Sequence, residues 1–132
     1  MELFEPQRAA CEVAGELEMV WRGEAKRDPA GGIWWPDDED DFCEDDWADL
    51  EDADFTDWVD DVEPEDFWWT FDDSRTLVGL NVVVRSIGPT LTVDTRRREV
   101  VASESGESAA VPLARGLCDR MLDELAPRFW AR

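Results

Sequence analysis

The chain has 132 residues, 43% of them hydrophobic, and a formal net charge of −21 at pH 7. This length and apolar content predict a single folded domain over residues 1–132 and argue against an intrinsically disordered chain. Because the chain has no His, no Tyr and a single Lys, the usual catalytic triads cannot be built, and we expect that the protein is not an enzyme.

The first predicted element is a helix from Pro6 to about residue 22. Apolar residues recur at helical spacing from Ala10 to Leu17, and proline suits the first turn of a helix. From Leu17 to Trp21, apolar residues also recur at every second position. The second half of this element is therefore compatible with a strand as well.

An intensely acidic segment follows at residues 37–73. It holds 20 of the 34 Asp and Glu residues and no Lys or Arg, which leaves 14 acids against 13 bases in the rest of the chain. Its apolar residues lie at helical spacing and predict two short helices, at about 43–53 and 55–62, with the aromatic side inward and the carboxylates outward. Pro64 is expected to end the second helix.

An antiparallel meander of about four strands is predicted for residues 67–104. Strand-forming residues cluster at 67–71, 76–85, 90–95 and 99–103, and turn residues separate the clusters. A C-terminal helix is expected over about 109–126, ended by Pro127. The predicted fold class is α+β, with N- and C-terminal helices and short acidic helices on the surface.

Metal and cofactor chemistry has little support in this sequence, and no cofactor is expected. Cys11, Cys43 and Cys118 are far apart and form no zinc-binding pattern. Alternating acids begin at Asp37 with the spacing of a calcium loop, but position six is Phe42 instead of Gly and position twelve is not Glu, which excludes an EF-hand. Weak divalent-cation binding by clustered carboxylates stays open.

The N-terminal residues contain neither a basic stretch nor a long apolar run, so we expect a cytoplasmic protein without a membrane segment. Localised negative charge attracts basic proteins and repels nucleic acids and anionic membranes. Arg96, Arg97 and Arg98 could contact nucleic acid or the chain's own acidic segment. A solvated hairpin turn is the favoured interpretation, and direct nucleic-acid binding is not expected.

The acidic segment is accordingly the predicted partner-binding site. As a single helix it would carry about one charge per 2.8 Å of axis, against about one per 1.7 Å for duplex DNA. The predicted contacts are its carboxylates and two indoles, namely Asp37, Asp38, Glu39, Asp40, Asp41, Glu44, Asp45, Asp46, Asp49, Glu51, Asp52, Asp54, Asp57, Asp60, Asp61, Glu63, Glu65, Asp66, Trp47 and Trp58.

In charge and size, residues 34–73 resemble the acidic inhibitors that mimic nucleic acid. This class includes phage anti-CRISPR and anti-restriction proteins and the immunity proteins of nuclease toxins. The resemblance implies an inhibitor that blocks the basic nucleic-acid-binding surface of a defence or nuclease protein, in the host cytoplasm if a phage encodes it. Two alternatives are an immunity protein for a cognate bacterial toxin and an acidic, solvated structural domain from a salt-adapted organism. A homodimer would extend the acidic surface.

Overall fold

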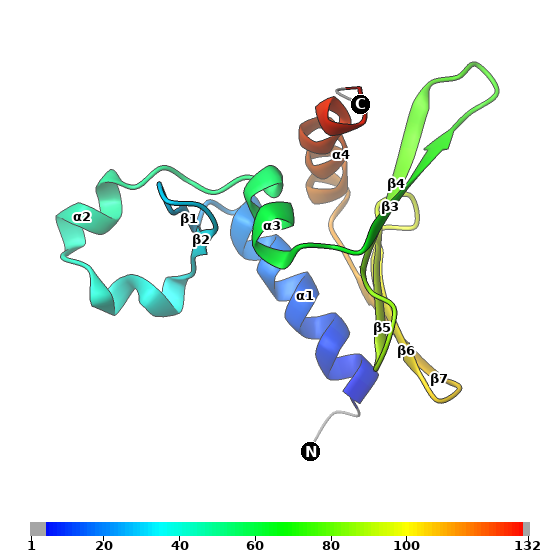
Figure 1. Cartoon of the computed structure of the whole chain (residues 1–132), viewed down its shortest axis with the longest axis horizontal. Coiled ribbons are helices and arrows are strands. Elements are labelled where there is room, and N and C mark those ends of the chain that lie inside the picture. Colours follow the sequence, from blue (N-terminus) through cyan, green and yellow to red (C-terminus); the bar gives the residue numbers. More distant parts are fainter. Residues whose placement is uncertain (1–4, 131–132) are drawn as a thin grey trace.

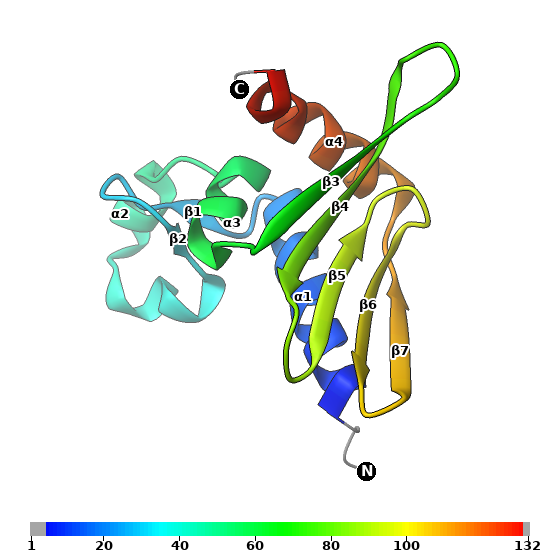
Figure 2. The ribbon, with the colours of Figure 1, turned by 45° about the vertical axis from the view of Figure 1, so that its right-hand side comes forward.

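The computed structural model describes residues 5–130 and has the predicted α+β class (Figures 1 and 2). Its elements in chain order are α1 (Glu5–Trp21), β1 (Lys26–Arg27), β2 (Ile33–Trp34), the 3-10 helix η1 (Pro36–Asp41), α2 (Glu44–Asp49), α3 (Phe55–Val62), β3 (Asp66–Phe71), β4 (Leu77–Arg85), β5 (Thr90–Asp94), β6 (Glu99–Glu104), β7 (Glu107–Pro112) and α4 (Arg115–Trp130).

The central sheet is a five-stranded antiparallel meander in the order β3-β4-β5-β6-β7. Its register aligns one apolar row across all five strands, formed by Phe67, Val82, Val93, Val100 and Val111. The helices lie on this face, and the opposite face of the sheet is uncovered (Figure 1). Alternation along each strand therefore separates a core face from a solvent face.

Helix α1 packs across β6 and β7 with one apolar stripe. The stripe keeps helical spacing to the end of the helix and comprises Ala9, Ala10, Val13, Ala14, Leu17 and Val20. The strand alternative for residues 17–21 is thus wrong, because Val20 needs the helical period to reach the core. Each Leu or Val that is fully buried here stabilises the fold by about 1.5–3 kcal/mol.

The C-terminal part of the chain differs most from the expectation. Residues 107–112 form β7, a fifth strand, instead of the first turns of a helix. Ser105 and Gly106, with φ of 53° and 84°, make the two-residue turn that folds β7 back onto β6. Helix α4 begins only at Arg115 and continues past Pro127 to Trp130, so Pro127 weakens its last turn without ending it.

A polar network joins α1, α3 and α4 at the side of the sheet. The backbone N–H of Phe55 donates to Oε1 of Glu124 at 2.8 Å. Arg120 bonds Oε2 of Glu124 at 2.7 Å and the carbonyl oxygen of Trp21 at 3.1 Å, and its guanidinium carbon lies 5.6 Å from the Phe55 ring centroid. These contacts fix α3 against α1 and α4. Helix α3 is the part of the acidic segment that packs on the body of the protein.

Among residues 5–130, no helix combines the length and the apolar character that crossing a membrane requires.

Candidate partner-binding surface

Residues 26–53 form a lobe that stands apart from the sheet and contains the first part of the acidic segment. Figure 1 shows this acidic lobe to the left of the helices. The chain leaves the body beside the point where it returns: Arg27 N donates to Glu51 O at 2.7 Å, and Ala53 N donates to Ala25 O at 3.0 Å. Strand β1 also pairs with β2 on its other side. Three short backbone segments therefore close the base of the lobe.

The lobe has its own small aromatic core. The rings of Trp34 and Phe42 meet edge to face with centroids 5.0 Å apart, and Phe42 meets Trp47 in the same way at 5.5 Å. Trp47 is only 9% exposed. Because a segment of this charge cannot fold by attraction between its own side chains, these aromatic contacts are what orders it.

The carboxylates of the lobe point outward, as the sequence predicted. Of the eleven acids between Asp37 and Asp52, only Asp38 is partly shielded, and the others are exposed. Asp38 accepts a hydrogen bond from the backbone N–H of Trp35 at 3.0 Å, at the start of η1. Acids at the first turn of a helix are favoured by the free N–H groups there, which helps this chain to hold like charges together.

Three basic side chains pair with acids in the second half of the acidic segment, from Glu51 to Asp60. Lys26 pairs with Asp52 at 2.7 Å, Arg27 with a group of three acids, and Arg128 with Asp60. Within residues 5–130, the nine acids from Asp37 to Asp49 make no ion pair, and the predicted alternative contact from Arg96, Arg97 and Arg98 is not formed. Those three residues are exposed at the turn between β5 and β6. The outer lobe therefore presents uncompensated negative charge.

Two of the predicted contacts serve the fold instead. Asp54 caps α3 by accepting bonds from Thr56 Oγ1 at 2.5 Å and Asp57 N at 3.0 Å. Asp57 bonds Asp54 N at 2.9 Å and Arg27 at 2.8 Å. Burial raises the pKa of Asp54, but the bonds from Thr56 and Asp57 and the charge of Arg27 outweigh it and hold the pKa below its ordinary value. Both carboxylates are therefore already occupied by contacts within the protein.

The two predicted indole contacts are also placed differently. Trp58 is fully buried, and its Nε1 lies 3.5 Å from Oε1 of Glu16 on α1. Trp47 belongs to the core of the lobe. Both indoles support the acidic surface from below and are not part of it. Among the tryptophans whose side chains are described, the exposed indole is that of Trp68, which is 63% exposed on β3. Strand alternation could have identified it, because Phe67 and Trp69 on either side face the core.

A shallow pocket of about 280 Å³ lies between α1 and the acidic lobe. It is lined by Met19, Trp35 and Pro36 together with the carboxylates of Glu16, Asp37 and Asp38. Burial raises the pKa of Glu16, the hydrogen bond from Trp58 opposes this, and the charges of Asp61 and Glu12 add to the rise. An apolar wall beside carboxylates can receive the stem and head of a basic side chain.

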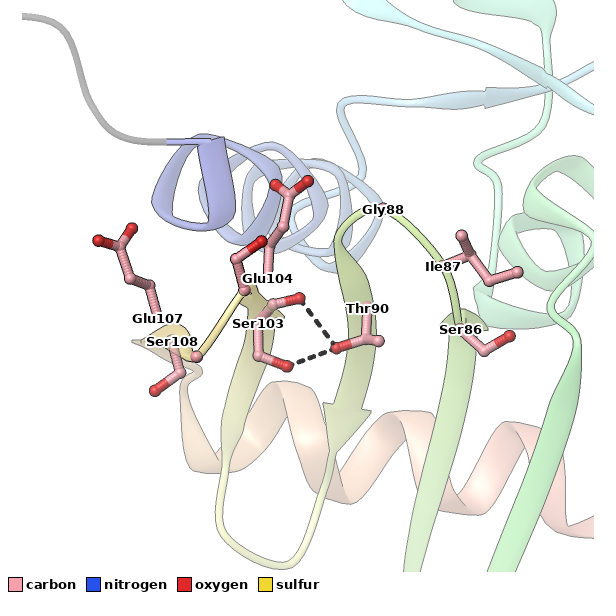
Figure 3. A pocket seen from close by; sticks show the side chains of 10 residues that line it. Ser86, Ile87, Gly88, Thr90, Ser103, Glu104, Glu107 and Ser108 are labelled. Carbon is pink, nitrogen blue, oxygen red and sulfur yellow. Dashed lines mark hydrogen bonds between the residues drawn. The ribbon is translucent and has the colours of Figure 1, made fainter.

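A second pocket, of about 490 Å³, lies between the β4–β5 and β6–β7 turns (Figure 3). Its one hydroxyl pair joins Thr90 Oγ1 to Ser103 Oγ at 2.6 Å, and the Thr90 hydroxyl also bonds the Ser103 carbonyl oxygen. The side chains of Glu104 and Glu107 turn away from this pair. A nucleophile needs a base within hydrogen-bond reach, and this arrangement does not provide one.

Two of the thiols, Cys43 and Cys118, have environments that disfavour the thiolate. A hydrogen bond to Asp46 and the charge of that residue raise the pKa of Cys43, and burial raises that of Cys118 to about 11. Both thiols are therefore held protonated. Between residues 5 and 130, no three His, Cys, Asp or Glu side chains converge as metal ligands.

Comparison of the chain with protein-family models, with curated proteins and with solved structures found no match.

Proposed function

We propose that this protein is an acidic inhibitor that mimics nucleic acid and blocks the basic nucleic-acid-binding surface of a defence or nuclease protein, acting in the cytoplasm. The observation that carries the proposal is the run of nine acids from Asp37 to Asp49, eight of them exposed, that no Lys or Arg neutralises within residues 5–130. A fold does not require such a run, because like charges held together oppose the compact state.

The order of the lobe supports mimicry over a generic solvated surface. Each carboxylate can accept charge-assisted hydrogen bonds from Arg or Lys, as a phosphate oxygen does. The core of Trp34, Phe42 and Trp47 holds these carboxylates in place, so a partner need not pay the entropy of ordering them. A basic groove that binds a duplex would meet a similar potential on this lobe and be steered toward it.

The first test is capture of a partner on the immobilised full chain, at low and at moderate salt, followed by its identification and purification. The proposal predicts one nucleic-acid-binding protein that survives moderate salt and is released by duplex DNA. A toxin that is retained at high salt and ignores DNA would overturn mimicry in favour of immunity. If the captured proteins are a mixture of basic proteins that all wash off at moderate salt, the remaining interpretation is a solvated acidic structural domain.

Two variants with the same change in charge locate the binding surface. In one, Glu39, Asp40, Asp41 and Asp45 of the lobe become Gln or Asn. In the other, four exposed acids elsewhere, Glu104, Glu107, Asp119 and Asp123, change in the same way. We expect the Kd of the captured partner to rise on the order of tenfold for the lobe variant and to change little for the control. Equal effects would mean that net charge alone drives binding.

A further inference from the structure

Trp68 is a large apolar side chain that the fold leaves in solvent. It is 63% exposed on β3, whereas Phe67 and Trp69 beside it pack against the core. Strand β3 is an edge of the sheet and lies next to α3, where the acidic segment continues (Figure 2). Exposed indoles contribute little to folding and are enriched among the residues that dominate binding energy at protein interfaces.

The indole of Trp68 is held in one orientation. Its Nε1 donates to Oδ2 of Asp66 at 3.1 Å, and Oδ1 of the same carboxylate accepts the backbone N–H of Phe67 at 2.8 Å. The carboxylate therefore lies at the edge of the ring and is itself fixed at both oxygens. Each oxygen keeps a free acceptor position, because an ionised carboxylate accepts about four hydrogen bonds.

The surroundings of this pair carry charges of both signs. On the uncovered face of the sheet, the register places Asn81 beside Trp68, followed by Asp94 and Glu99 on the next strands. Among residues 5–130, Asp66, Asp94 and Glu99 make no ion pair, but Oδ1 of Asp94 accepts the backbone N–H groups of Arg96 and Arg97 at 3.0 Å. The three arginines at 96–98 are exposed at the turn between Asp94 and Glu99, so Asp66 is the carboxylate that defines this site. Toward α3, Glu63 and Glu65 are also exposed.

We infer that Trp68 and Asp66 together form the docking site for one arginine side chain of the basic partner. The guanidinium stacks on the free face of the indole, and its N–H groups bond the Asp66 carboxylate at the ring edge. Arginine fits better than lysine because its planar head can stack and form forked hydrogen bonds at the same time. This inference rests on the proposed function for the basic character of the partner, and it specifies one anchor of the interface.

Nuclear magnetic resonance on the full 15N-labelled chain tests the site directly. The probes are two peptides, one with alternating Arg and Gly and one with Lys in place of Arg. Trp68→Phe assigns the indole N–H signal of Trp68 among the eight Trp. We expect the Arg peptide to shift this signal saturably and at lower concentration than the Lys peptide, while the signal of buried Trp58 stays in place.

The outcomes separate this inference from the proposed function. If the Arg peptide shifts backbone signals of the acidic lobe but leaves Trp68 unmoved, the arginine site is refuted and the acidic surface stands. If both peptides move Trp68 equally, the preference for arginine is refuted. If neither peptide shifts any signal, the protein does not bind basic chains, and both the arginine site and the proposed function are refuted.

Substitutions with a matched control give the second measurement. Trp68→Ala should weaken binding of the Arg peptide about tenfold, and Asp66→Asn should weaken it severalfold. Ile87→Ala removes an apolar residue that is 80% exposed, in the turn between β4 and β5, and should change the Kd less than twofold. Thermal unfolding of each variant checks that the fold is retained. Equal effects of Trp68→Ala and Ile87→Ala would overturn the site.

Discussion

At the scale of single residues, Glu16 shows the cost of placing acids close together. Its carboxyl lies on α1 against Trp58, where burial raises its pKa above the ordinary 4.5 despite the hydrogen bond from the indole. An acid whose pKa is raised on folding stabilises the protein when both states are protonated, and that contribution is lost as the pH rises through the native pKa. Ionised Glu16 thus destabilises the fold at neutral pH.

Replacing Glu16 by Gln should therefore stabilise the protein in a pH-dependent way. The amide oxygen can still accept the Trp58 N–H, but it carries no charge. We expect the Tm of Glu16→Gln to exceed that of the parent by a few degrees at pH 7, and the difference to vanish below about pH 4.5, where the parent is protonated in both states. Thermal unfolding between pH 4 and pH 8 measures this.

Glu107→Gln, at an exposed position, is the control and should show no such difference. A Tm for Glu16→Gln that equals the parent value at every pH would contradict the assignment of a raised pKa to Glu16.

At the scale of elements, the two residues of β1 hold the acidic lobe to the body. Arg27 alone bonds Glu51 at 2.7 Å, Asp54 at 3.3 Å and Asp57 at 2.8 Å, so one guanidinium connects the end of the lobe to the start of α3. These three carboxylates raise the pKa of Arg27, led by the hydrogen bond to Asp57. Without this arginine, they would repel one another at the base of the lobe.

Arg27→Ala should loosen the lobe and lower the free energy of unfolding by about 1–2 kcal/mol, since it breaks charge-assisted bonds at partly buried partners. Amide hydrogen exchange should rise in residues 36–53, and the sheet should keep its protection. The control is Arg22→Ala, which removes only an exposed pair to Glu18 at 3.6 Å and should cost less than about 0.5 kcal/mol. Similar losses for both variants would show that Arg27 is not a specific clamp.

At the scale of the whole molecule, negative charge is most concentrated in the acidic lobe: residues 26–53 hold 12 of the 34 acids against two bases, whereas the other 104 residues hold 22 acids against 11 bases. The lobe stands to one side of the sheet, so its field is not cancelled by the Arg residues of the body (Figure 2). Mutual repulsion among these acids opposes folding, and salt screens it, since the Debye length is about 10 Å at 0.1 M. Stability should consequently depend on ionic strength.

We expect the protein to be folded at low salt and its Tm to rise by a few degrees between about 20 mM and 0.3 M NaCl. The variant with Gln or Asn at Glu39, Asp40, Asp41 and Asp45 should start at a higher Tm and rise less. Scanning calorimetry across the salt series measures both. A Tm that falls with salt would mean that ion pairs such as Lys26–Asp52 outweigh the repulsion. Folding only in molar salt would point to a salt-adapted domain.

Local sequence patterns were sufficient for the fold class and for most strands. The turn before Leu77 and the turn at Arg96, Arg97 and Arg98 separate β-rich runs, and the structure confirms these two hairpins. The outward carboxylates and inward aromatics followed from the helical spacing, but the predicted helix at 43–53 is too long. The observed helix α2 ends at Asp49, and residues 36–41 form the 3-10 helix η1, which was not predicted. The confirmed features are predictable because a strand period, a helix period and a turn each depend on a few neighbouring residues.

Other features were decided by the tertiary structure. Residues 107–112 have a composition that a helix or a strand could use, and pairing with β6 made them a strand. The same is true of the indoles: Trp58 is buried because α1 and α3 pack together, and Trp68 is exposed because no helix covers its face of the sheet. The sequence by itself thus determined that this protein concentrates its acids in one segment with aromatic support. Which acids are neutralised and which indole meets solvent depended on contacts between residues far apart in the chain, such as Arg27 with Asp57.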